Sequence, residues 1–269
     1  MTRGRSPSRF GPATWSSIVA VALAASAALV GVFWPHVYRD EAIVRDGWFP
    51  NDLVTLLVTI PALVVARSRA AKGSRGAALV WLGTLHYLVY NGAFYVLGAT
   101  LNVLFPLYVA MTVTALWSLI HLAARTPAAD ATGPHRGVAA WMIFMALGLG
   151  TVWIAKWAGA MLHPATPTRF DEAPEFLRLV AAMDLSFMVA FFLPGAIWLW
   201  RGRPWGHVIG VTLNVSAAIY NLVLVGGSVV QLRAGLAGAG PMIGLWAFLA
   251  AGCGASAIRL LGSTRRAPS

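Results

Sequence analysis

Runs of about twenty apolar residues recur along nearly the whole chain, and only short polar stretches separate them. A helix of that length spans the roughly 30 Å hydrocarbon core of a bilayer, whereas a membrane β-barrel alternates in polarity over strands of roughly ten residues. The pattern therefore predicts an all-α integral membrane protein with eight transmembrane helices. We place these spans at residues 15–34, 51–66, 78–97, 103–124, 138–162, 179–200, 207–230 and 241–261.

Composition supports the same class. Hydrophobic residues make up 58% of the 269 residues and charged residues 11%, whereas soluble domains carry roughly 25% charged residues. The segment from Gly76 to Ala124 contains no charged residue and is too long for one crossing. We expect it to turn back at Gly98–Asn102, which separates the third span from the fourth.

The net charge of +11 comes mainly from basic clusters between the spans. Alternate connections differ in sign, and by the positive-inside rule both termini are then cytoplasmic. The acidic connections carry Asp40, Glu41, Asp46, Asp171, Glu172 and Glu175. This placement favours the lipid bilayer as the partner and argues against nucleic acid. Arginine far outnumbers lysine, as is typical of a GC-rich genome, and we expect a multi-pass protein of the bacterial plasma membrane.

The first span has a second interpretation as a signal peptide, because arginines precede an apolar run that contains Ala25-Ser26-Ala27. The run continues to Trp34, which is longer than a usual signal-peptide core. We therefore expect the segment to be retained as a transmembrane span.

Two stretches of the chain repeat the same order of residues. The first contains Asp52-Leu53, Pro61, Arg67-Ser68-Arg69 and Tyr90-Asn91, and the second contains Asp184-Leu185, Pro194, Arg201-Gly202-Arg203 and Tyr220-Asn221. We interpret them as a 4+4 parallel tandem repeat, with residues 1–137 and 138–269 as the two four-helix units. Coincidence is the alternative, since these dipeptides are common.

Few strongly polar side chains interrupt the spans, and each is a candidate for binding a ligand or a proton because charge inside a membrane is costly. These candidates are Asp184, Asp52, Lys156, Tyr90, Asn91, Tyr220, Asn221 and His86. The helical rise places Asn91 and Asn221 roughly 21 Å from the cytoplasmic edge and Asp184 roughly 8 Å below the outer edge. We therefore expect a polar pocket in the outer half of the membrane, between the two repeats.

Pro61 and Pro194 occupy matched positions in the two stretches. A proline inside a helix leaves a backbone carbonyl without its partner and allows a kink. We predict these two residues to be hinges.

Each candidate also has a purely structural interpretation. Asp52 follows Pro50-Asn51 and could cap the second span. Lys156, between two tryptophans, could reach the membrane interface or pair with Asp184. The two Tyr-Asn pairs could form hydrogen bonds between helices, and His86, one turn before Tyr90, could be a hydrogen-bonded core residue.

The sequence predicts no cofactor and no metal site. Cys253 is the only cysteine, which excludes an intrachain disulfide and a multi-cysteine metal site. Haem or a di-metal centre would need several ligands inside the bundle, whereas every histidine except His86 lies at a span end or in a connection. No phosphate-binding loop, nucleophile elbow or zinc motif is present in the sequence.

These features favour a small carrier or ligand-binding membrane protein, with an unidentified small molecule or lipid as ligand. Asp184 would be the main charged group, Asp52 its counterpart in the other repeat and Lys156 the counter-charge. One alternative is a non-catalytic structural or assembly protein, acting as a homo-oligomer or in a larger membrane complex. The other is a membrane-embedded lipid-modifying enzyme, with Asp184 and either His86 or Tyr90 as acid and base.

Overall fold

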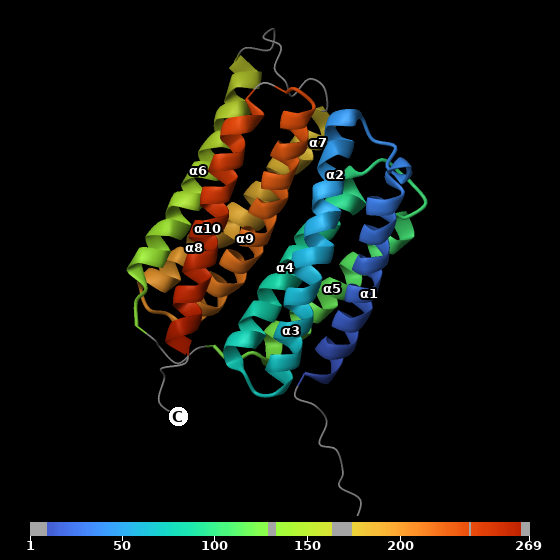
Figure 1. Cartoon of the computed structure of the whole chain (residues 1–269). Helices are drawn as coiled ribbons and strands as arrows, with labels where there is room; N and C mark the ends of the chain where they lie inside the picture. The colour runs from blue at the N-terminus through green and yellow to red at the C-terminus, as the bar shows by residue number, and fades with distance from the viewer. Residues whose placement is uncertain (1–9, 129–132, 163–173, 237, 265–269) are drawn as a thin grey trace, which may run out of the picture.

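A computed structural model describes residues 10–128, 133–162, 174–236 and 238–264 of the chain, which form a bundle of long helices (Figure 1). The elements are α1 (Gly11–Phe33), the 3-10 turn η1 (Pro35–Val37), α2 (Ala42–Val54), the π-helical segment η2 (Thr55–Thr59), α3 (Ile60–Ala71), α4 (Arg75–Gly98), α5 (Phe105–Arg125), α6 (Arg136–Leu162), α7 (Pro174–Met183), the π-helical segment η4 (Asp184–Val189), α8 (Ala190–Trp200), α9 (Pro204–Arg233) and α10 (Ala239–Thr264). Because α2, η2 and α3 run on without a break, as do α7, η4 and α8, the described residues form eight rods.

Each predicted span falls within one rod, except that span 15–34 ends one residue after α1 and span 103–124 begins two residues before α5. The all-helical class is confirmed for the described residues. Seven rods are long and apolar enough to cross a membrane, which is compatible with a multi-pass membrane protein. The remaining rod, α4, has His86, Asn91 and three tyrosines among its apolar residues. Fourteen of its 24 residues are buried, so these polar groups face other helices.

The start of the second span was predicted wrongly. The sequence placed it at residue 51, whereas α2 begins at Ala42 and includes Pro50 as an internal residue. Proline is tolerated in the first turn of a helix and is unfavourable in its interior, so the sequence around Pro50 indicated a helix start. The structure instead places Pro50 inside α2. The predicted turn after Gly98 is confirmed, since α4 ends there and α5 begins at Phe105.

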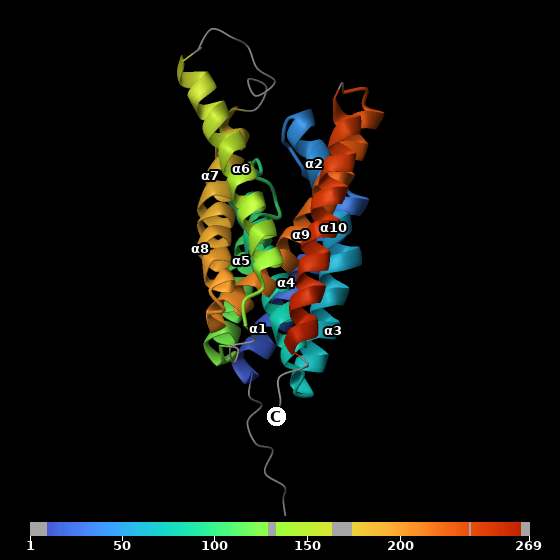
Figure 2. The ribbon, with the colours of Figure 1, turned by 90° about the vertical axis from the view of Figure 1, so that its left-hand side faces the viewer.

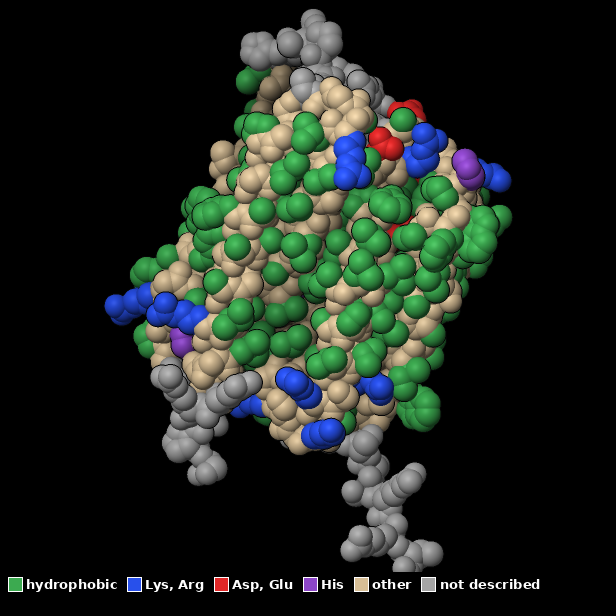
Figure 3. All heavy atoms as spheres, viewed as in Figure 1, with side chains coloured by type: hydrophobic (Ala, Val, Ile, Leu, Met, Phe, Trp, Pro, Cys, Tyr) green, Lys and Arg blue, Asp and Glu red, His purple; other side chains and the backbone are tan. Residues whose placement is uncertain are grey.

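Helix α1 begins and α10 finishes at the same end of the bundle, which we call the terminal end (Figure 1). The connections 34–41 and 99–104 and residues 234–236 and 238 lie at the opposite end, the loop end (Figure 1). Every described Asp and Glu belongs to the loop-end half, whereas the described charges near the terminal end are all basic. Figure 3 shows basic side chains gathered at the lower, terminal end of the visible face and apolar side chains covering its flank. This is the charge difference from which a cytoplasmic position of the termini was predicted.

The centre of the bundle is formed by α4 and α9, which pack against each other. A Cβ atom at Gly83 of α4 would lie 2.5 Å from Cβ of Val215 and 3.0 Å from the Thr212 carbonyl oxygen of α9. The absence of a side chain at Gly83 therefore allows the two backbones to approach closely, as small residues do in membrane helix pairs.

The outer helices pack around this pair in different ways. Helix α1 packs on α5, and its buried residues there are small, as at Ala13 and Ser17, which both contact Ser118 of α5. Helix α10 packs along α9. Helix α6 packs on η4 and α8 and meets α10 where Trp141 contacts Gly252, and the two helices then diverge toward the loop end (Figure 2). The loop-end part of α6 is consequently exposed on most of its surface.

Candidate functional site

Asp52 is the centre of a buried hydrogen-bond network in the loop-end half of the bundle. Its side chain is 2% exposed, and its two carboxylate oxygens accept bonds from different hydroxyls. Tyr38 donates to Oδ2 at 2.6 Å and Tyr95 donates to Oδ1 at 2.6 Å. Tyr38 comes from the connection before α2 and Tyr95 from α4, so the carboxylate joins three parts of the chain.

The alternative interpretation of Asp52 as a helix cap is wrong. The residue lies in the last turn of α2, ten residues after its first residue, and no side chain caps the start of that helix. The Asp52 carboxylate instead accepts hydrogen bonds from the hydroxyls of Tyr38 and Tyr95. Burial, and then the neighbouring Asp52, raise the pKa of Tyr38, which keeps its hydroxyl protonated as a donor.

Gly31 of α1 creates the space that this network occupies. A Cβ atom at that position would overlap both the Asp52 carboxylate and the Tyr38 hydroxyl. The aromatic rings around the carboxylate are also closely packed, with Trp48 stacked on Tyr95 at 4.5 Å and Tyr95 stacked on Tyr108 at 4.8 Å between centroids. Asp52 thus lies against α1 and beside a stack of aromatic rings.

Asn51, next to Asp52, extends the network along the same face of α4, because Tyr87, Asn91 and Tyr95 are spaced four residues apart. Its Nδ2 donates to Oδ1 of Asn91 at 2.6 Å, and its Oδ1 accepts from the Tyr87 hydroxyl at 3.1 Å. Asn91 therefore forms a hydrogen bond between helices, as its structural interpretation predicted. The side-chain amides of both asparagines are buried.

Asp184 forms a second network on the other side of α4. It is the first residue of η4 and is 5% exposed. The Tyr90 hydroxyl donates to Oδ1, and the Trp153 indole N–H of α6 donates to Oδ2 at 2.8 Å. Tyrosines of the central helix α4 thus bind both buried aspartates, Tyr95 one and Tyr90 the other.

The predicted pairing of Asp184 with Lys156 is wrong. Among the described residues the one ion pair joins Arg178 to Glu175. The Lys156 ammonium instead lies 4.9 Å from the centroid of the Trp153 ring, at an exposed position on α6. Trp153 thus lies between the two charges, with its ring toward Lys156 and its N–H toward Asp184.

A chain of aromatic rings connects the two networks. Phe176 of α7 contacts Trp48 edge-on at 5.8 Å and Phe94 at 6.4 Å between centroids. Tyr220 of α9 contacts Phe94 and, edge-on at 5.1 Å, the ring of Tyr90. The two aspartates are therefore parts of one continuous packed layer, although each has its own donors.

The other predicted site residues are placed differently. Asn221 donates to the Ala217 carbonyl oxygen of its own helix, and Tyr220 takes part through its ring. Nδ1 of His86 is 2.9 Å from the Ser216 hydroxyl, and this contact links α4 to α9. Pro61 and Pro194 are exposed on the bundle surface. The contact with Ser216 matches the interpretation of His86 as a hydrogen-bonded core residue better than a role as acid or base beside Asp184.

Sequence reasoning missed Tyr38, Asn51 and Trp153. Tyr38 lies outside any span, and Asn51 was read as part of a helix start. Trp153 was considered only as a neighbour of Lys156 near the membrane interface. Because the two residues are about one helical turn apart, they lie on the same side of α6, and either could have been the residue that contacts Asp184. No group of three or more His, Cys, Asp or Glu that could hold a metal ion occurs among the residues described.

Comparisons of the chain with protein-family models, with curated proteins and with solved structures gave no match.

Proposed function

We propose that this chain is a small membrane carrier or ligand-binding protein, in which Asp52 and Asp184 bind a proton or a cationic group in the loop-end half of the bundle. The observation that carries this proposal is the state of the two carboxylates. Both are buried, and within the described residues neither forms an ion pair. A buried carboxylate held only by neutral donors is costly when charged, and a proton or a cation relieves that cost.

Aromatic rings favour a cationic group over an anionic one at the same place. Trp48, Tyr95 and Tyr108 stack beside Asp52, and the rings of Trp153 and Tyr220 adjoin the Asp184 network. The faces of such rings attract cations, and the effect grows where water is excluded. The contact of Lys156 with Trp153 is an example of this attraction within the chain.

We further propose that residues 1–137 and 138–269 are related four-helix units whose relative movement opens the site. Contacts between the units support this relation. The loop-end part of the second rod, α2, packs on α9, and Pro50 contacts Gly226. The corresponding part of the sixth rod, α7, packs on α4, where Gly98 contacts Phe176 and Leu179. Each unit's second rod thus crosses to the other unit's third rod, as a two-fold relation requires.

The π-helical segments support a role for the same two rods in movement. Segment η2 lies between Asp52 and Pro61, and segment η4 begins at Asp184 and ends before Pro194. Such segments leave the regular hydrogen-bond pattern and are frequent at functional sites. We propose that Pro61 and Pro194 act with these segments as hinges.

Asp184→Asn is expected to remove ligand binding while the protein stays folded. The amide keeps an acceptor for Trp153 or Tyr90 but can neither carry charge nor exchange a proton. The experiment is a thermal-shift screen of amine, zwitterionic and neutral compounds on detergent-purified protein, followed by titration of the hits at several pH values. We expect at least a tenfold loss of affinity and of its pH dependence in the variant.

Glu175→Gln is the matched control, because it removes one acidic charge from the same rod at an exposed position. It should bind the hits like the wild type. The proposal fails if Asp184→Asn also binds them with unchanged affinity and unchanged pH dependence.

A structural or assembly role is the second candidate, and the close packing around both aspartates favours it. All four carboxylate oxygens already accept a hydrogen bond. In that case substitutions of Asp52 and Asp184 should lower only stability, and the screen should give no compound whose binding depends on them.

We also propose that the terminal end faces the cytoplasm. In a Cys253→Ser background, Glu41→Cys at the loop end should react with a membrane-impermeant maleimide in intact cells, because residue 41 is exposed. Lys72→Cys at the terminal end should react only after the cells are opened. The reverse result would invert the orientation.

A further inference from the structure

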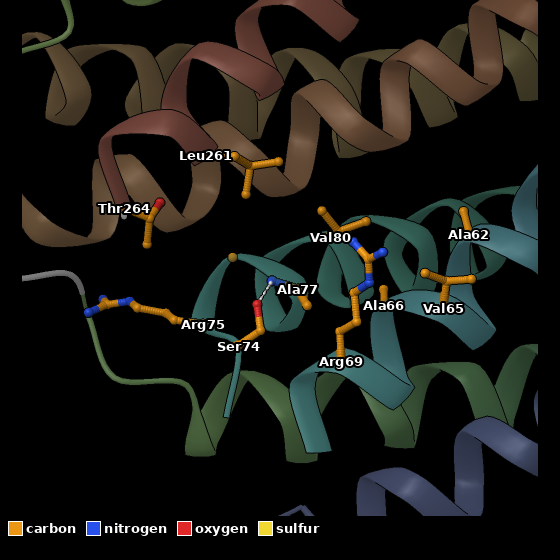
Figure 4. Close-up of a pocket in the computed structure, with 11 residues that line it drawn as sticks. Ala62, Val65, Ala66, Arg69, Ser74, Arg75, Ala77, Val80, Leu261 and Thr264 are labelled. Atoms are coloured by element: carbon orange, nitrogen blue, oxygen red, sulfur yellow. Dashed lines mark hydrogen bonds between the residues drawn. The ribbon is translucent and has the colours of Figure 1, made fainter. Parts of the chain in front are cut away.

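A cavity lies at the terminal end, between α3, the start of α4 and the last turns of α10 (Figure 4). Its volume is about 490 Å³. It lies nearer the terminal end than the aspartate networks, since Ala62, its lining residue nearest to Asp52 on that rod, is roughly 15 Å farther along the helix. The function proposed above makes no use of it.

The wall toward the terminal end is basic and polar. Arg69, Ser74 and Arg75 line it, and Figure 4 shows the Arg69 side chain extending from α3 along the gap toward Val80. Ser74 caps α4 by accepting a bond from the Ala77 N–H. Arg75 donates from Nη2 to the Pro127 carbonyl oxygen, and Figure 4 shows its side chain extending away from Arg69. The Arg69 guanidinium therefore offers the cavity donors and positive charge that an anionic oxygen would satisfy.

The wall toward the middle of the bundle is apolar. Ala62, Val65 and Leu261 line it, and Ala62 lies roughly 10 Å along the helix from Arg69. Val65 is 49% exposed on the flank of the bundle, so the cavity opens sideways as well as toward the end. A soluble anion would need only the basic wall, whereas a lipid would use both, with its headgroup at Arg69 and an acyl chain along the apolar wall.

We propose that this cavity binds an anionic phospholipid, whose phosphate contacts Arg69 and whose acyl chain lies along Ala62 and Val65. Basic pockets between membrane helices on the positively charged side are suited to such headgroups. The lipid would also fill the space between α3 and α10, two helices from different halves of the chain, and would hold them together.

The test is native mass spectrometry of the detergent-purified protein titrated with phosphatidylglycerol or with phosphatidylcholine of the same acyl chains. Phosphatidylglycerol should bind more tightly to the wild type. Arg69→Gln should weaken its binding about fivefold, the effect expected for one cation near an anionic headgroup. Arg67→Gln, on the same helix but outside the cavity, should leave binding unchanged.

Val65→Trp separates a lipid from a free anion. The larger ring should fill the apolar wall and abolish phosphatidylglycerol binding while leaving the arginines in place. Stabilisation by inorganic phosphate that depends on Arg69 but not on residue 65 would overturn the lipid assignment. Equal binding of both lipids, or equal losses in Arg67→Gln and Arg69→Gln, would overturn the site itself.

Discussion

Asp52→Ala is expected to give the largest loss of stability of any single substitution in the aspartate networks. The change leaves the Tyr38 and Tyr95 hydroxyls buried without their acceptor, at a cost of about 1–3 kcal/mol for each. The free energy of unfolding, measured by denaturant titration in mixed micelles, should fall accordingly. Asp52→Asn retains an acceptor oxygen and should lose clearly less.

Two further variants test whether this loss comes from the network. Gly31→Ala should destabilise in the same direction, because its new methyl group would displace the Asp52 carboxylate. Asp46→Ala removes an acid from the same helix, outside the network, and should change stability by no more than about 0.5 kcal/mol. If Asp52→Ala is as stable as Asp46→Ala, the hydrogen bonds of Asp52 contribute nothing to the fold.

Gly83→Ala is expected to lower the free energy of unfolding by about 1–3 kcal/mol, the range for overpacking a well-packed core. The added methyl group would meet Val215 and the Thr212 carbonyl of α9, and the backbone atom cannot turn aside as a side chain can. The crossing of α4 and α9 must then widen. The nearby contact between His86 and Ser216 should weaken with it.

Gly227→Ala on α9 is the matched control, because a Cβ atom there meets nothing within 4 Å. It should leave stability unchanged or raise it by roughly 0.5–1 kcal/mol, as replacement of an unconstrained helical glycine does. Equal melting temperatures for the two variants would show that the α4–α9 crossing tolerates a side chain at residue 83.

The candidate site was predictable in its residues but only partly in its contacts. Asp52, Asp184, Tyr90 and Asn91 stood out because each is polar within an apolar run, and the structure places all four in buried networks. The partners that hold the two aspartates were not predicted. A cap was one interpretation of Asp52 and the Lys156 ammonium was the expected counter-charge of Asp184, whereas both acids accept hydrogen bonds from aromatic side chains.

These errors have a physical cause in the rotation and depth of each helix. Lys156 and Trp153 are one turn apart on α6, and which of them faces Asp184 depends on how α6 is turned against η4. The bond from Tyr38 to Asp52 depends on how the connection folds back over α2. Neither the rotation of α6 nor the path of this connection is determined by a local run of residues.

The sequence alone determined the helical class, the approximate limits of the rods and the difference in charge between the two ends, because hydropathy and charge act locally on each segment. Only the tertiary structure decided that α4 and α9 form the centre, that tyrosines of α4 bind both aspartates and that Lys156 lies over a tryptophan ring. In a bundle whose helices are apolar on nearly every side, the pattern of polarity does not say which face meets which neighbour. Close packing at glycines such as Gly31 and Gly83, and a few buried hydrogen bonds, make that choice.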